Sequence, residues 1–167
     1  MEQLNWWLLP VVAIIPLIVG FVWYQPNVFG KAWLKSAEIT KERAQSGNIL
    51  IFFGLAYLFS ILAAYMLAMI TVHQTGIAQL FFMDPIMEDA NSEAMKLITS
   101  LRDNFGDRHR TFGHGFIHGI EAGLLFGLPL IGIVTLFERR SFKYAIIHIG
   151  YYMLCFGLMG GILGAYL

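Results

Sequence analysis

Long apolar stretches, separated by polar segments, make up most of the chain. The apolar stretches lie at about 6–24, 49–72, 111–136 and 142–167. About 20 mainly apolar residues are enough for a helix to cross the hydrocarbon core of a bilayer. The pattern therefore predicts an all-α fold, a polytopic membrane protein whose four transmembrane helices form a single transmembrane domain, a four-helix bundle, over residues 1–167.

The polar segment between the second and third stretches, residues 74–110, has a helical pattern of its own. Either Asn91 or Ser92 can cap a helix at its start. Apolar residues then recur at spacings of three and four, which places them on one helical face. They are Met95, Ile98, Leu101 and Phe105. We expect an extramembrane insert with a short amphipathic helix.

The composition agrees with a membrane protein and excludes nucleic acid as a partner. Hydrophobic residues make up 57% of the chain and charged residues 13%, whereas a soluble domain has about 25% charged residues. Eleven basic and eleven acidic side chains cancel, so the chain lacks the basic surface that nucleic-acid binding requires. We expect membrane lipids as partners. Neither a nucleophile elbow nor a phosphate-binding loop occurs, so the sequence does not predict an enzyme.

Basic residues are unevenly distributed between the polar segments. The two shorter segments, 25–48 and 137–143, hold seven basic residues between them. The insert at 74–110 holds four, together with six acidic residues. Because loops rich in Lys and Arg remain in the cytoplasm, we predict that the two short segments are cytoplasmic. Both termini and the insert are then outside.

The third apolar stretch contains ionisable residues that a bilayer disfavours. His114, His118 and Glu121 are spaced by four and three residues, so they share one face of a helix. An ionisable residue at membrane depth is a candidate for a functional role. Tyr152 in the last stretch lies at the depth of Glu121, which makes it the expected hydrogen-bond partner. These four residues form the candidate functional cluster.

His73 ends the second stretch close to where the third begins. Together with His114, His118 and Glu121, it has the ligand types that a divalent ion such as zinc prefers. The same histidines are equally compatible with ordinary hydrogen bonding to carbonyl groups or water. Glu121 likewise has two interpretations, a group in a small proton-linked transporter or a polar contact between helices.

Glycines spaced by three or four residues recur in the last two stretches. A glycine inside a helix costs about 1 kcal/mol relative to alanine, and close contact between helices can offset this cost. The expected helix-packing residues are Gly115, Gly119, Gly123, Gly127, Gly157, Gly160, Gly161 and Gly164. Whether the second glycine ridge packs within the chain or against another copy is open.

The glycine ridges favour a glycine-zipper contact and a homo-oligomer as the leading hypothesis. The chain would then be a self-associating helix bundle, or an accessory subunit of an assembly with other membrane proteins. The two alternatives are a small proton-linked transporter that uses Glu121 and a divalent-metal-binding membrane protein that uses His114 and His118.

Two stretches resemble a known family. They are VWYQPNVFGKAWLK, Val22–Lys35, and LFERRSFKYAIIHIGYYMLCFGLMGGILG, Leu136–Gly164. Together they resemble the bacterial and fungal membrane family known as domain of unknown function 1761. The resemblance implies a small four-helix protein of the bacterial cytoplasmic (inner) membrane and brings no assigned activity. The insert at 74–110 is longer than the family's usual connection, so the resemblance implies no role for it.

Overall fold

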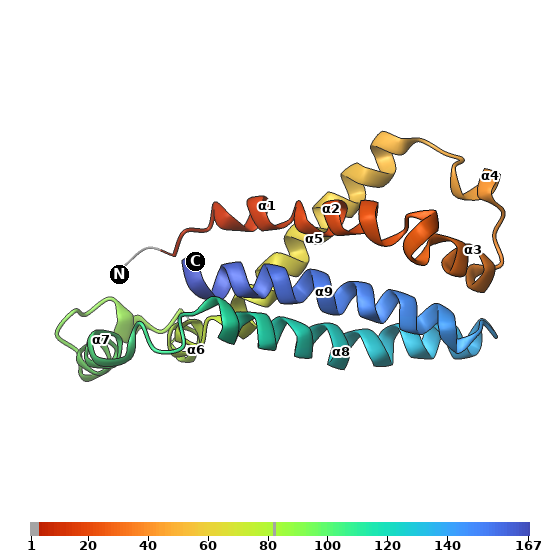
Figure 1. Ribbon diagram of the computed structural model, residues 1–167. Coiled ribbons are helices and arrows are strands. Elements are labelled where there is room, and N and C mark those ends of the chain that lie inside the picture. The colour runs from red at the N-terminus through yellow and green to blue at the C-terminus, as the bar shows by residue number, and fades with distance from the viewer. Residues whose placement is uncertain (1–3, 82) are drawn as a thin grey trace.

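The computed structural model describes residues 4–81 and 83–167, and all regular structure within these ranges is helical (Figure 1). Three helices are long and apolar enough to cross a membrane. They are α5 (Ile49–Thr71), α8 (Phe112–Phe137) and α9 (Phe142–Tyr166). A fourth span exists only if the bent pair Leu8–Trp23 and Pro26–Ala37 counts as one. The all-α prediction is confirmed, while the fourth span depends on this bent pair.

The first apolar stretch folds as two short helices instead of one. Helix α1 (Leu8–Val12) and helix α2 (Ile15–Trp23) are separated at residues 13 and 14. Pro16 lies in the first turn of α2, where a proline is tolerated, but it has no N–H to donate to the carbonyl of Val12 and so disfavours one continuous helix through both segments. A π-helical turn, Pro26–Gly30, then leads into α3 (Lys31–Ala37), and the chain bends by 57° between α2 and this segment.

Helices α8 and α9 are antiparallel neighbours that pack backbone to backbone (Figure 1). A Cβ atom on Gly119 would overlap the carbonyl oxygen of Phe156 and lie 2.5 Å from its carbonyl carbon. A Cβ atom on Gly160 would lie 2.5 Å from the carbonyl oxygen of Gly115. No larger residue fits these positions without separating the two helices.

The glycines of α9 are used in this contact within one chain. Gly161 packs on the ring of Phe112 of α8, and Gly164 packs on the backbone of Gly115. Gly127 of α8 differs, because a Cβ atom there would make only an ordinary contact, 3.8 Å from Ile149. The α9 glycines therefore give no support to a contact between copies of the chain.

Helix α5 runs at an angle to α8 and α9 and meets them with its C-terminal third (Figure 1). Leu50 near its start is 80% exposed, whereas Leu67 near its end is 2% exposed. Leu67 belongs to a core that also contains Val12 of α1 and Met159 of α9. This packing places the end of α5, and His73 two residues beyond it, beside the start of α8.

Both ends of the described chain lie at the same end of the molecule. The backbone N–H of Asn5 donates to the carbonyl of Leu167 at 2.9 Å. Helices α6 (Gln74–Leu80) and α7 (Glu93–Phe105) lie at this end too (Figure 1). Helix α3, the short α4 (Lys41–Ala44) and the turn between α8 and α9 lie at the opposite end.

The insert contains the amphipathic helix that the sequence predicts, because α7 occupies Glu93–Phe105. The hydroxyl of Ser92 caps it by accepting from the N–H of Met95 at 3.2 Å. The insert also contains α6 and a 3-10 turn, Pro85–Met87, which the sequence analysis does not anticipate. The connection between α5 and α8 is thus a folded unit.

Candidate metal centre

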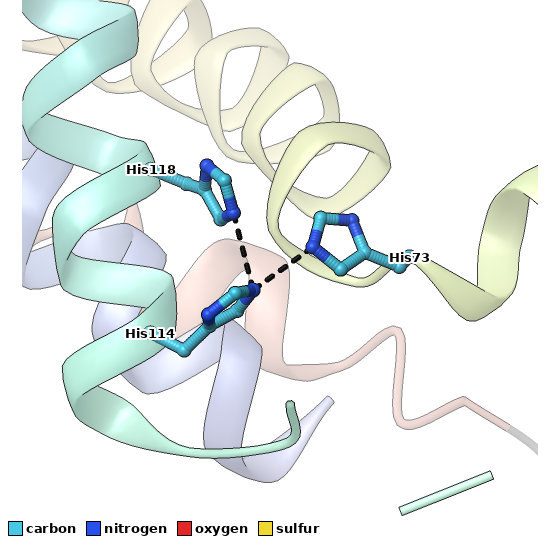
Figure 2. Close-up of side chains that lie close together, drawn as sticks. All are labelled: His73, His114 and His118. Atoms are coloured by element: carbon cyan, nitrogen blue, oxygen red, sulfur yellow. Dashed lines mark hydrogen bonds between the residues drawn. The ribbon is translucent and has the colours of Figure 1, made fainter. Parts of the chain in front are cut away.

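Three histidines from two helical segments point toward one another (Figure 2). His73 directly follows the C-cap of α5, while His114 and His118 occupy the first two turns of α8. Nε2 of His114 lies 2.9 Å from Nε2 of His73 and 3.1 Å from Nε2 of His118. All three side chains offer a nitrogen within 4.8 Å of the others. The structure thus brings together His73, His114 and His118, three of the four residues that the sequence suggests as metal ligands.

Local structure around α8 sets the direction of its two histidines. The hydroxyl of Thr111 caps the helix by accepting from the N–H of His114 at 3.2 Å, which fixes where the helix begins. A spacing of four residues then places His118 directly above His114. Gly115 and Gly119 hold a different side of α8 against α9, so the two histidines are turned toward the end of α5.

Glu121 contacts the cluster from outside its centre. Its carboxylate lies 3.0 Å from Nδ1 of His118. A carboxylate only accepts hydrogen bonds, so Nδ1 of His118 is the donor when Glu121 is in its carboxylate form. The Glu121 side chain is 55% exposed, against 26% for His118. Glu121 therefore orients the imidazole of His118. Although the sequence suggests Glu121 as a metal ligand, its carboxylate does not lie where the three Nε2 atoms meet.

The close contacts among the three Nε2 atoms cannot all be full hydrogen bonds. A neutral imidazole has one N–H and one lone pair. Because Nδ1 of His118 donates to Glu121, its Nε2 directs a lone pair toward His114. Nε2 of His114 faces the ring nitrogen of His73 as well, and one nitrogen cannot make a full hydrogen bond to both. A cation at the meeting point would be coordinated by all three lone pairs.

The surroundings of His73, the residue of the cluster that lies beyond the end of α5, favour its neutral form. Partial desolvation by the neighbouring atoms lowers the pKa of His73, although the residue is exposed, and the nearby His118 and His109 lower this pKa further. Histidine ordinarily has a pKa near 6.5. His73 is therefore neutral at pH 7, which is the form that binds a metal.

His109 is a fourth histidine at this place, and the sequence analysis does not include it. Its ring stacks on His114 with ring centres 4.7 Å apart, and it approaches the edge of His73 at 6.1 Å. His109 lies in the turn between α7 and α8, outside any helical pattern. The available signals were its position, a few residues before His114, and composition, since four of the five histidines of the chain gather here.

Tyr152 is not part of this group, which corrects its expected bond to Glu121. Its ring contacts Tyr151 at 5.1 Å and Phe156 at 5.5 Å between ring centres. Glu121 is bonded to His118 instead. The two residues lie at similar depth, but α8 and α9 present them on different sides.

The fifth histidine, His148, belongs to a separate aromatic cluster on α9. Its Nδ1 lies 2.8 Å from the hydroxyl of Tyr24, and the ring of Tyr144 stands edge-on to it at 4.4 Å. His148 therefore contributes nothing to the centre formed by His73, His114 and His118.

Comparison with known proteins agrees with the resemblance seen in the sequence. Residues 7–164 match the sequence model of a family described as Protein of unknown function (DUF1761). No curated protein and no solved structure matches the chain. The match covers nearly the whole chain, including the histidine cluster and all but the last two residues of α9, so the chain belongs to the DUF1761 family.

Proposed function

We propose that this chain is an integral membrane protein that binds a divalent transition-metal ion, such as zinc, through His73, His114 and His118. The convergence of three imidazole nitrogens, one from each ring, within 4.8 Å of one another supports this function. Glu121, on Nδ1 of His118, supplies the carboxylate partner that metal-bound histidines usually have.

The spacing of the nitrogens is close to what an ion requires. Zinc binds imidazole nitrogen at 2.0–2.1 Å in a tetrahedral site, which puts neighbouring ligand nitrogens about 3.3 Å apart. The distances from Nε2 of His114 to the other two nitrogens, 2.9 and 3.1 Å, are shorter by a few tenths of an ångström. Small side-chain rotations would therefore admit the ion. Imidazole ligands favour zinc, copper, nickel or cobalt over magnesium or calcium.

Exposure of the site indicates how an ion would enter. His73 is exposed and lies at the end of the molecule that carries α6, α7 and both chain ends. If the basic segments are cytoplasmic, as the positive-inside rule predicts, this end faces outward. The ion would then come from the outer aqueous phase of a bacterial inner membrane and would not need to cross the hydrocarbon core.

Metal content after purification tests this function. The full chain is purified in detergent with a tag that contains no histidine, and bound zinc is measured by mass spectrometry. We expect stoichiometric zinc in the wild type and its loss in the double variant His114→Ala, His118→Ala. His148→Gln is the matched control, because it removes a histidine outside the cluster, and it should retain zinc. Equal zinc in the wild type and the double variant would contradict the proposal.

Self-association is a second candidate, favoured by the surface around Glu121. Its side chain is half-exposed on a helix whose neighbouring Ile117 and Leu125 are 58% and 68% exposed. A carboxylate that faces lipid is costly, and a second copy packed on this face would shield it. Ile117→Cys or Leu125→Cys should then cross-link two chains in lipid. The native Cys155 is fully buried and should not react. Absence of cross-links at both positions would count against a dimer on this face.

A further inference from the structure

Hydrogen bonds from Gln74 hold the segment between α7 and α8 next to the histidine centre. Gln74, the residue after His73, donates from Nε2 to the carbonyl of Arg108 at 2.9 Å and to that of Phe105 at 3.4 Å. These bonds hold the segment over the start of α8 and bring His109 against the rings of His114 and His73.

The ring of His109 lies beside the three converging histidines, although its nitrogens are not among those that lie within 4.8 Å of one another. With metal–nitrogen distances of 2.0–2.1 Å, the ring centres of imidazoles in a tetrahedral site lie about 5 Å apart. The three converging rings have centres 5.0, 5.0 and 4.5 Å apart. The centre of the His109 ring lies 4.7 Å from that of His114 and 6.1 Å from that of His73. Its distances to two of the rings are thus within about 1 Å of this spacing.

We propose that His109 supplies the fourth ligand, so that a divalent ion of the zinc class is held by four imidazoles and fastens the insert to the spans. This inference rests on the proposed metal-binding function. His109 now lies flat on His114, with 25° between the ring planes, so binding requires its ring to turn one nitrogen toward the ion. The residue is exposed and lies in a turn, where no helix restricts that rotation.

Four protein ligands close the coordination shell. Structural zinc sites have four protein ligands, whereas catalytic sites keep one position open for water or substrate. Occupancy of this centre would accordingly set the position of residues 106–110, and with them the end of α7. The ion then acts as a clamp between the extramembrane insert and the membrane-spanning helices.

Two substitutions at His109 separate ligation from stacking. His109→Phe keeps an aromatic ring on His114 but has no nitrogen, and His109→Ala removes both. Zn²⁺ affinity is measured by competition with a chelating dye on the full chain in lipid discs. We expect both variants to bind Zn²⁺ at least about tenfold more weakly than the wild type, since even residues beyond the ligands cost 10- to 100-fold. Bound Co²⁺ should change its visible spectrum in both.

A second measurement is limited proteolysis of the wild type, with His109→Phe as the control. Trypsin can cut after Arg108, which is exposed, and Zn²⁺ should slow this cut if His109 becomes a ligand. The same cut in His109→Phe should be insensitive to Zn²⁺.

Wild-type affinity in His109→Phe, or cleavage of the wild type that Zn²⁺ leaves unchanged, would overturn the role of His109 while leaving a three-histidine site intact. A folded wild type that binds no Zn²⁺ would overturn the metal-binding function itself, and this inference with it.

Discussion

Replacing Gly119 by alanine tests the contact that positions the histidine-bearing helix. The added Cβ atom would overlap the carbonyl oxygen of Phe156, lie 2.5 Å from the carbonyl carbon and lie 2.8 Å from the Cα atom of Gly157. All three atoms belong to the backbone of α9, so none can rotate away. Restoring an ordinary contact of 3.4 Å to the carbonyl carbon requires α8 and α9 to separate locally by about 1 Å.

The expected free-energy change combines two opposing effects. Overpacking a close contact costs about 1–3 kcal/mol, and we expect the upper end here because backbone meets backbone. Alanine recovers about 1 kcal/mol of helix propensity relative to glycine. Gly119→Ala should therefore lower the free energy of unfolding by about 2 kcal/mol. Because His118 is the adjacent residue, Zn²⁺ affinity should fall as well.

Unfolding by dodecyl sulfate in mixed micelles, followed by circular dichroism, measures this change. Gly132→Ala is the control, because it lies in the same helix and a Cβ atom there has no neighbour within 4 Å. The control should be neutral or stabilised by up to about 1 kcal/mol. If Gly119→Ala unfolds at the same detergent fraction as the wild type, the backbone contact between α8 and α9 is not the one described.

Three further predictions concern the metal centre and the orientation. Glu121→Gln removes the charge beside Nδ1 of His118 and should weaken Zn²⁺ binding 10- to 100-fold; unchanged affinity in a titration would refute its orienting role. Zn²⁺ binding should be full at pH 7, where His73 with its lowered pKa is neutral, and should be lost toward pH 5 as protons compete; a flat pH profile would exclude histidine ligands. In intact cells, Lys96→Cys should react with an impermeant maleimide and Arg139→Cys should not. The opposite labelling would contradict the predicted orientation of the insert and the basic segments.

The sequence was sufficient for the three long helices and for the shared face of His114, His118 and Glu121. Apolar length identifies α5, α8 and α9, and spacing alone places these side chains on one side of α8. The bond expected between Glu121 and Tyr152 was wrong because it used depth along the helix axis only. Which way a helix is turned depends on its packing, and the glycine contacts with α9 turn Glu121 away from Tyr152.

The position of the His109 ring and the tilt of α5 could not be predicted from the sequence, because both depend on packing. His109 has a positive φ of 65° within a turn, a conformation that no periodic pattern specifies. The tilt of α5 follows from packing only its C-terminal third on α9, although its sequence is apolar along its whole length. Both features arise from contacts between segments that are distant in the chain.

X-ray absorption at the zinc edge of the loaded full-length protein tests the metal centre most directly. We predict one zinc per chain with at least three nitrogen neighbours at about 2.0–2.1 Å and the multiple-scattering pattern of imidazole. Removing His114 should abolish that pattern. A first shell without imidazole, or an imidazole pattern that survives His114→Ala, would contradict a centre built on His73, His114 and His118.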